Sequence, residues 1–528
     1  MLNSRSKQQT SRNLNQVSTP FGRPGDRAMK AAHQVASNYS TGASMNANAA
    51  SMKVSHGLTN AQENTQLYAY ESSVRESFDN IVPTLKKISA LQHETNFEQQ
   101  AQQLARTQLG FELPALLLNN AWVDQLDMRS LFAWSVFETY HRFCDEVFTR
   151  DPLAHIGMGH KSMGQNNNDA SFQNFIQECG FHMVDVSPCA DGRLAHVIRY
   201  VLRMPYKEVR RRSYAGAMFD IEDSLEKWVK TELLRFREGK PNTADAATRY
   251  LKTVVYHHSS VDPGHQGCAA HGSDTKKAAE GGLERLTGFK QAVENTHCCG
   301  ASIDCLLIGM DTDTDGIRIH MLDENGEINL ENYVDSLQVF DTTARMSAND
   351  AEQWIADHIK DKGGNALTEG MARFMSYLLK NNMSQVEYVR GYYGGCYSDI
   401  GHAERFIGAG IGFEEIQLRN LTFFSYLNTV EEAAADLDVG ISIFTGLNVS
   451  QGLPVPIVVR YDYHGNVPGA RERAEEHCQR VSSALHNRYS DLTDRGLLHT
   501  LQVVRDINSA GQIEILDCSV KTNVTGGH

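Results

Sequence analysis

The sequence lacks the features that would carry a protein into or across a membrane. No run of about 18 apolar residues occurs anywhere in the chain, so we predict no membrane-spanning helix. The first residues are charged and polar, without the apolar stretch of a secretion signal, so we do not expect export. The 10 cysteines are then expected to be reduced thiols or metal ligands rather than disulfides.

Acidic residues are nearly missing from the first 60 residues, which hold seven Lys or Arg and only Asp26. This segment carries +6 while the whole chain carries −14, so the remainder carries −20 by subtraction. The segment is also rich in Ser, Asn, Gln, Ala and Gly, so we predict that residues 1–62 form a basic tail, disordered until it binds a partner. A solvated leader without a partner is the alternative. Nucleic acid is not expected as a partner, because the acidic remainder repels phosphate.

The 528 residues are enough for several domains with hydrophobic cores. Apolar residues at helical spacing, such as Leu67 and Phe78, predict a helical domain over residues 63–160. Alternating helical and strand-like stretches predict an α/β domain over residues 161–398 and a second α/β pattern over residues 399–528. The predicted helices cover residues 222–238, 276–294, 349–382 and 470–488, and the predicted strands cover residues 181–187, 252–257, 303–310, 316–322, 440–445, 455–463 and 498–507.

The motif Cys189-Ala190-Asp191-Gly192-Arg193 follows the first predicted strand of the α/β domain. If this stretch stays extended, alternate side chains point the same way, and Cys189, Asp191 and Arg193 share one face. The motif would then place a soft metal ligand beside a carboxylate that an arginine already binds.

Further metal ligands follow a second strand-like run, at residues 251–256. That run ends in His257-His258, and ten residues separate His257 from Cys268. Cys189, His257 and Cys268 make a Cys₂His set, and three protein ligands with one open position describe a catalytic zinc site. Local chemistry alone does not separate His257 from His258.

These residues resemble the β-class carbonic anhydrases, whose zinc motif is Cys-x-Asp-x-Arg. Most β-class enzymes place the ligand His and Cys much closer together than His257 and Cys268 are here. The wide spacing is typical of the carboxysome shell carbonic anhydrases, a divergent β-class family once called the epsilon class. Similar stretches carry the resemblance towards the C-terminus, at residues 216–223, 267–272, 297–304 and 399–405.

The resemblance implies an α/β fold in which a β-carbonic-anhydrase-like catalytic domain precedes a degenerate second copy of itself. Residues 401–528 contain no Cys-x-Asp-x-Arg motif, and neither Cys478 nor Cys518 has a matching ligand context. One chain would then imitate a β-class dimer while holding one zinc ion, with His257 favoured over His258 as the ligand. We expect the chain itself to form a homodimer or a higher homo-oligomer.

The activity that the resemblance implies is the reversible hydration of CO₂ to bicarbonate and a proton. Zinc would acidify a bound water, Asp191 would accept a hydrogen bond from the resulting hydroxide, and Arg193 would hold Asp191 away from the metal. His402 and Glu404, from the domain junction, are candidates for the substrate pocket. The implied setting is an α-type carboxysome inside the bacterial cytoplasm. There the enzyme would lie on the inner face of the shell and supply CO₂ to Rubisco, with the basic tail binding Rubisco or the shell.

Other polar groups have simpler interpretations. The cysteine pair at residues 298–299 could bind a metal, but neighbours on a strand point to opposite faces, so buried thiols are favoured. The acidic loop at residues 311–316 resembles the start of a calcium loop. Leu322 stands where that loop needs glutamate, so a solvated turn is favoured. His271 is expected to support the metal site rather than to bind the metal.

Two other classes of function stay open from the sequence. A thiolate-site zinc hydrolase would need an acid or nucleophile motif, and the sequence displays none. A non-enzymatic scaffold could keep an inactive site. Zinc content together with the rate of CO₂ hydration separates the three alternatives.

Overall fold

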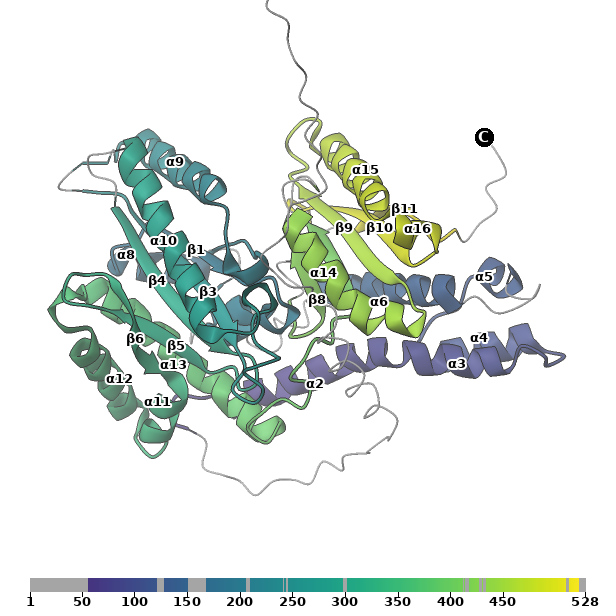
Figure 1. The fold of residues 1–528 in the computed structure, drawn as a ribbon, viewed down its shortest axis with the longest axis horizontal. Coiled ribbons are helices and arrows are strands. Elements are labelled where there is room, and N and C mark those ends of the chain that lie inside the picture. The colour runs from purple at the N-terminus through teal and green to yellow at the C-terminus, as the bar shows by residue number, and fades with distance from the viewer. Residues whose placement is uncertain are drawn as a thin grey trace, which may run out of the picture. The chain divides into compact units, whose positions relative to one another are not determined.

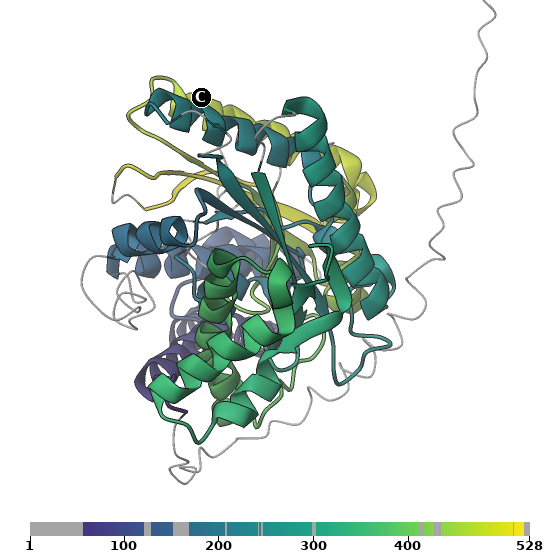
Figure 2. The same ribbon diagram turned by 90° about the vertical axis from the view of Figure 1, so that its left-hand side faces the viewer.

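The computed structural model describes residues 56–120, 128–150, 168–205, 209–240, 242–243, 246–297, 302–411, 413, 417–426, 430, 434–509 and 512–521. All of them belong to the part of the chain that runs from Asn46 to His528. They form a group of N-terminal helices and two β-sheets with flanking helices (Figures 1 and 2). Residues 1–55 of the predicted basic tail lie outside these ranges. None of the helices described is long and apolar enough to span a bilayer.

The N-terminal helices are α2 (Ala61–Asp79), α3 (Ile81–Ala90), α4 (Phe97–Gln108), α5 (Ala115–Asn120) and α6 (Met128–Arg150). Asn60 caps the first of them, because its side chain accepts hydrogen bonds from the backbone N–H groups of Gln62 and Glu63. Leu67 and Phe78 are buried, as their helical spacing predicts. They belong to a core that these helices share with the C-terminal sheet, where α6 packs on one of the strands.

The first sheet has six strands: β1 (Met183–Pro188), β2 (Arg210–Arg211), β3 (Arg249–His258), β4 (Ser302–Asp311), β5 (Ile317–Leu322) and β6 (Ile328–Asp335). Their order is β2-β1-β3-β4-β5-β6. The first four pair in parallel, so their carboxyl ends meet at one edge, and β5 and β6 add antiparallel pairs. Almost every residue of β1 and β3 is buried, as expected of parallel strands covered on both faces.

Helices cover this sheet along its length. Helix α10 packs on β3 and β4 and against α9, whereas α11, α12 and α13 pack on β5 (Figure 1). The helices of this part are α8 (Asn168–Glu178), α9 (Ile221–Arg237), α10 (Thr275–His297), α11 (Ser336–Thr343), α12 (Ala348–Gly363) and α13 (Glu369–Tyr392).

The second sheet has five strands: β7 (Phe406–Gly410), β8 (Thr422–Ser425), β9 (Val455–Tyr463), β10 (Leu498–Asp506) and β11 (Glu514–Cys518). Their order is β11-β10-β9-β7-β8, and only β11 is antiparallel to its neighbour. Helix α15 packs on β9 and β10, and α14 packs on β8 and β9. The helices of this part are α14 (Ala434–Leu447), α15 (Ala470–Arg488) and α16 (Ser490–Asp494).

The two sheets share one order of elements. In each sheet, the first strand in the chain lies between a short parallel strand and the next long strand. In the first sheet β1 lies between β2 and β3, and in the second sheet β7 lies between β8 and β9. A helix precedes the second long strand in both sheets, and another follows it, namely α9 and α10 in the first sheet and α14 and α15 in the second. A third parallel strand and then an antiparallel one complete the shared part.

Two predictions of local structure are wrong. Residues 440–445, predicted as a strand, lie in α14, where Leu437, Ile441 and Phe444 are buried at helical spacing against the second sheet. The single helix predicted over residues 349–382 is divided into α12 and α13, because the chain turns at Gly364 with a φ of 56°. The sequence analysis also did not predict β2, β6, β7, β8 and β11.

The acidic loop at residues 311–316 is buried, so the prediction of a solvated turn is also wrong. Asp311 is the last residue of β4, and Asp313 and Asp315 follow it before β5. Hydroxyl, amide and imidazole groups hydrogen-bond to the three carboxylates. Buried carboxylates are tolerated when they are paired in this way. Asp311 accepts hydrogen bonds from Ser260 and Thr314, Asp313 from Ser259 and Val261, and Asp315 from Gln385 and Tyr397, with His196 as its ion-pair partner.

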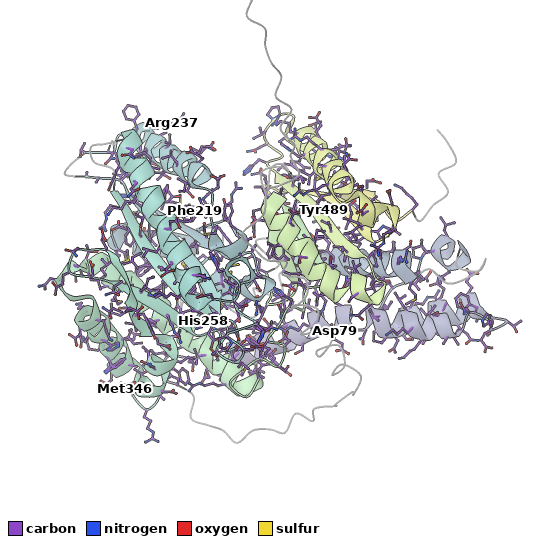
Figure 3. The ribbon with its side chains drawn as sticks, viewed as in Figure 1. Asp79, Phe219, Arg237, His258, Met346 and Tyr489 are labelled. Carbon is purple, nitrogen blue, oxygen red and sulfur yellow. The ribbon has the colours of Figure 1, made fainter. Side chains whose placement is uncertain are left out.

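A buried lysine lies in the core of the first sheet. Lys252 Nζ lies 3.0 Å from Asp185 Oδ2 and donates to the hydroxyls of Ser187 and Ser224. It also lies 4.1 Å from the centroid of the Phe219 ring. Figure 3 labels Phe219 among the side chains of the protein. Burial lowers the pKa of Lys252 and Asp185 raises it, which leaves a pKa of about 8.

We predict that Lys252→Ala destabilises the fold by roughly 3–5 kcal/mol, because it removes one partner of a buried ion pair. Lys380→Ala is the matched control, since Lys380 pairs with Glu352 at the surface, where such a pair contributes roughly 0–1 kcal/mol. Urea unfolding followed by intrinsic fluorescence measures both. Equal unfolding midpoints for the two variants would contradict the prediction.

Candidate metal centre

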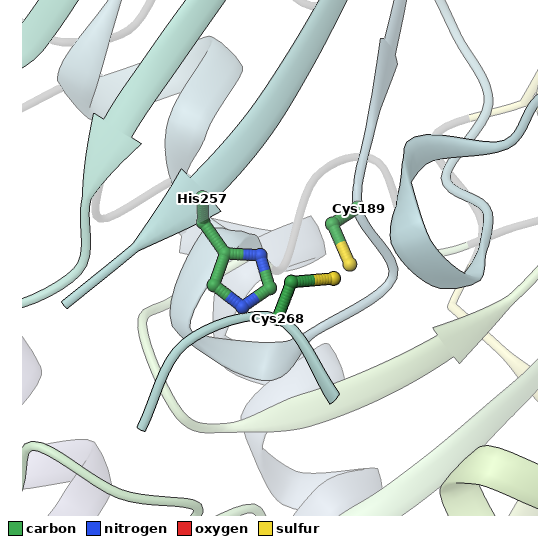
Figure 4. A group of neighbouring side chains, drawn as sticks. All are labelled: Cys189, His257 and Cys268. Atoms are coloured by element: carbon green, nitrogen blue, oxygen red, sulfur yellow. The ribbon is translucent and has the colours of Figure 1, made fainter. Parts of the chain in front are cut away.

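Three buried side chains meet at the carboxyl edge of the first sheet (Figure 4). Cys189 directly follows β1, and its N–H donates to the Val255 carbonyl at 3.0 Å, which keeps it in register with β3. His257 is the penultimate residue of β3. Cys268 immediately precedes a short 3₁₀ turn, Ala269–His271. The potential ligand atoms of Cys189, His257 and Cys268 all lie within 4.8 Å of one another.

The chemistry of these three groups fits a thiophilic cation. Tetrahedral zinc, with Zn–S near ~2.3 Å and Zn–N near ~2.0 Å, needs ligand atoms roughly 3.5–3.8 Å apart, within the observed limit. A hydrogen bond between the two thiols raises the pKa of Cys189, which burial raises as well, and lowers the pKa of Cys268. His257 Nδ1 is buried without a hydrogen-bond partner in the part of the chain described.

The negative character of the centre is visible in His257 itself. Burial lowers the pKa of His257, but Cys189 and Asp191 outweigh burial and raise it to about 9. His258, the alternative ligand, is buried away from the two cysteines, and burial lowers its pKa to about 4.

Arg193 holds Asp191 beside the three ligands. Its Nε donates to Asp191 Oδ1 at 2.9 Å and its Nη2 to Oδ2 at 2.7 Å, and both residues are buried. The remaining nitrogen, Nη1, donates to the backbone carbonyls of Gln266 and Ile400 at 2.6 and 2.9 Å. Asp191 Oδ2 lies 3.3 Å from His257 Nε2. Burial raises the pKa of Asp191, but Arg193, with help from His402 and His257, lowers it well below its usual range.

The backbone of the motif does not stay extended, so the prediction of one shared strand face is wrong. Cys189 still pairs with the sheet, but the chain bends at Ala190, and Asp191 caps a 3₁₀ turn, Gly192–Leu194, through a hydrogen bond from the Arg193 N–H at 2.9 Å. The turn still brings the three side chains into one site, because Arg193 folds back onto Asp191 rather than pointing along the strand.

His402 and Glu404 reach the same site from the segment before β7. Glu404 Oε1 accepts the Gly192 N–H at 3.1 Å and lies 2.9 Å from His402 Nδ1. His402 Nε2 lies 3.7 Å from Asp191 Oδ2. Glycine is required at position 192, since a Cβ there would lie only 2.4 Å from Glu404 Cγ. The structure therefore brings both pocket candidates to Asp191.

Several contacts at the site could not be found from the sequence. Backbone carbonyls hold Arg193, and the Asn420 N–H donates to the Gly192 carbonyl at 2.8 Å, but backbone groups leave no signature in residue types. His271 is not among the clustered ligands and lies 3.2 Å from the Gly216 carbonyl. The cysteine pair at residues 298–299 lies outside the described residues.

Comparison with known proteins identifies the family. Three models of carboxysome shell carbonic anhydrase match the chain: the N-terminal part over residues 56–148, the catalytic domain over 171–402 and the C-terminal part over 403–520. The relatives named carboxysome shell carbonic anhydrase include that of Prochlorococcus marinus subsp. pastoris, 50% identical over 473 residues, which cover 90% of this chain and 92% of the relative. The relative from Parasynechococcus marenigrum is 51% identical and covers 90% of this chain and 80% of its own length. That from Halothiobacillus neapolitanus is 45% identical, with coverage of 84% and 86%. The chain therefore belongs to the carboxysome shell carbonic anhydrase family.

Proposed function

We propose that this protein is a zinc-dependent carbonic anhydrase that interconverts CO₂ and bicarbonate inside an α-type carboxysome. Membership of the family supports the reaction and the compartment. The observation that carries the proposal is the Cys189, His257 and Cys268 cluster with an arginine-held carboxylate beside it. The cluster supplies three ligands and leaves a fourth position open, the pattern of a catalytic zinc site.

The metal and its ligands set the pH range of the reaction. When bound, zinc would lower the pKa of water and so supply hydroxide as the nucleophile at moderate pH. Two thiolates cancel its formal charge, so we expect a weaker effect than three neutral histidines give. Activity should therefore increase towards alkaline pH.

Asp191 and Arg193 have separate roles in this mechanism. Asp191, whose pKa lies well below its usual range, would accept a hydrogen bond from the hydroxide and so orient an oxygen lone pair towards CO₂. Arg193 occupies both carboxylate oxygens and so keeps Asp191 from moving onto the metal, a geometry that the planar guanidinium fork suits. His402 and Glu404 border the side of the site where substrate would enter.

The second sheet is a degenerate copy of the catalytic unit in this account. The order of strands and helices shared by the two sheets supports it, as does the absence of a Cys-x-Asp-x-Arg motif after residue 400. In the described part of the chain, potential metal ligands cluster in two groups: Cys189, His257 and Cys268, and Asp191, His402 and Glu404. Each group contains at least one residue of the segment 189–268, and neither group lies wholly within the second sheet. One chain then completes a single site with its own second copy, holding one zinc ion.

The assembly around the enzyme is the last part of the proposal. The enzyme lies on the inner face of the shell as a homodimer or a higher homo-oligomer and supplies CO₂ to Rubisco. Its basic tail, residues 1–55 of which lie outside the described part of the chain, binds Rubisco or the shell. The charge of +6 over the first 60 residues supports an acidic binding surface as its target.

We predict that Cys268→Ala lowers zinc content from one ion per chain to near zero and abolishes CO₂ hydration. Cys305→Ala is the control, because that thiol lies in β4 and is not part of the ligand cluster. Elemental analysis and stopped-flow CO₂ hydration measure the two properties. A Cys268→Ala protein with normal zinc and full activity would remove Cys268 from the ligand set.

We predict that Asp191→Asn keeps its zinc but loses roughly 10²–10³ in kcat, the usual cost of removing one electrostatic contact to the reacting group. Arg193→Lys keeps a positive charge but loses the planar fork, so Asp191 should move onto the metal. A crystal structure and zinc analysis of each variant test these roles. Asp191 unmoved in Arg193→Lys would rule out the gatekeeping role of Arg193.

We predict that deleting residues 1–55 leaves kcat and KM nearly unchanged, because the proposed ligands all lie beyond residue 188. The same deletion should abolish packaging and Rubisco or shell binding. Binding of the full chain should weaken between low and high salt, since the Debye length falls from about 10 Å at 0.1 M to about 3 Å at 1 M. Replacing Arg5, Lys7, Arg12, Arg23 and Arg27 by Glu gives a control of equal length. Normal packaging of both altered proteins would show that the folded domains carry recruitment.

A further inference from the structure

Cys268 reaches the metal centre differently from the other two proposed ligands. Cys189 and His257 are held by pairing within the first sheet, the first through its bond to the Val255 carbonyl and the second as a residue of β3. Residues 259–267, which lead from β3 to Cys268, form neither helix nor strand. The position of this thiol therefore depends on contacts that fix a loop rather than on sheet pairing.

Two aspartates of the buried loop at residues 311–316 hold the start of this segment. Asp313 Oδ2 accepts the Ser259 hydroxyl at 2.7 Å and the Val261 N–H at 2.8 Å. Asp311 accepts the Ser260 N–H at 3.1 Å on Oδ1 and the Ser260 hydroxyl at 2.7 Å on Oδ2. Asp313 is fully buried and Ser259 is 1% exposed, so little water competes for these hydrogen bonds.

The hydrogen bonds continue from Ser259 towards the arginine of the site. Ser259 Oγ also accepts the Asp262 N–H at 2.9 Å, and the Asp262 carbonyl accepts the Gln266 N–H at 2.9 Å. The carbonyl of Gln266, two residues before Cys268, then accepts Arg193 Nη1 at 2.6 Å. The loop is thus held by the aspartates at its start and by Arg193 near its end.

Asp313 can anchor the loop because its own backbone is fixed. Its N–H donates to Asp311 Oδ1 at 3.3 Å, and its carbonyl accepts the Tyr397 N–H at 2.9 Å. The preceding residue, Thr312, donates its N–H to the His258 carbonyl at 2.9 Å and so joins the acidic loop to the end of β3. Within the described part of the chain, Asp313 Oδ1 has no hydrogen-bond partner, so the carboxylate serves the loop through Oδ2.

We propose that Asp313 is a positioning residue for the metal centre, fixing the loop 259–267 so that Cys268 meets Cys189 and His257. This inference rests on the proposed function. Asp313 touches neither the ligand atoms nor the position of the substrate, so it acts through Cys268. Ordering a loop costs conformational entropy, and a loop that is already ordered does not lose that entropy when the ion binds.

The first test measures zinc affinity by competition with a chromophoric chelator. In Asp313→Ala the loop loses two hydrogen bonds, so the affinity should fall roughly 10- to 100-fold, the range for groups that support metal ligands. Excess zinc should then restore kcat. Asp313→Asn should bind zinc nearly as tightly as the wild type, because its amide oxygen can still accept from Ser259 and Val261. Wild-type affinity in Asp313→Ala, or equal losses in the two variants, would overturn the proposal.

Asp323→Ala is the matched control. Asp323 likewise accepts N–H groups of its own turn, those of Asn325 and Glu327, both at 2.9 Å. That turn lies between β5 and β6 and carries no residue of the ligand cluster. This variant should bind zinc as the wild type does. A loss of affinity equal to that of Asp313→Ala would show an unspecific effect and contradict the positioning role.

Ser259→Ala covers the case in which Asp313→Ala folds poorly. It removes only the hydroxyl that links Asp313 to the Asp262 N–H, so zinc affinity should fall here too, though less than in Asp313→Ala. Wild-type affinity in Ser259→Ala would show that this link does not position the loop.

Hydrogen exchange followed by mass spectrometry tests the loop without using activity. In zinc-free Asp313→Ala, peptides covering residues 259–267 should exchange faster than in zinc-free wild-type protein, while peptides from the interior of β3 and β4 should be unchanged. Unchanged exchange in the loop, or equally faster exchange in loop and strands, would contradict the positioning role. Wild-type protein that binds no zinc would instead reject the proposed function.

Discussion

The guanidinium of Arg193 is the contact on which the rest of the site depends. It binds both oxygens of Asp191 and the backbone carbonyls of Gln266 and Ile400, so it joins the end of β1, the loop that carries Cys268 and the segment that leads to β7. Arginine suits this position because it stays charged when buried and offers five donors in a fixed plane. Without it, a buried carboxylate would lie 3.3 Å from His257 with no fixed partner of opposite charge.

The second sheet completes the site rather than merely extending the fold. Glu404 and His402 precede β7, and the backbone of Asn420 binds the carbonyl of Gly192. A catalytic unit consisting of the first sheet alone would therefore keep the three ligands but lose the groups that surround Asp191. This dependence gives a physical reason for keeping the second sheet, although no cluster of potential metal ligands lies wholly within its described residues.

Much of this arrangement follows from the sequence. Apolar runs predicted β1, β3, β4, β5, β9 and β10, and the parallel pairing of β1 and β3 explains why residues at their ends, Cys189 and His257, meet. The failures have local causes. The β-branched stretch in α14 favours a strand by composition, and only burial of Leu437, Ile441 and Phe444 on the second sheet makes it a helix. The loop at residues 311–316 is polar in sequence, and its burial depends on partners such as His196 and Tyr397, which are distant in the chain. Local chemistry did not separate His257 from His258, and only the resemblance favoured His257; in the structure His257, and not His258, is grouped with the two cysteines.

The central claim is that two thiolates and one imidazole of this chain hold a single zinc ion with one open position. X-ray absorption at the zinc K-edge of the purified wild-type protein, combined with its zinc content, tests it most directly. The account predicts one zinc per chain, with two sulfur neighbours at about 2.3 Å, one nitrogen at about 2.0 Å and one oxygen that is not supplied by the protein. A zinc-free protein, four sulfur neighbours or a coordination shell of nitrogen and oxygen alone would contradict it.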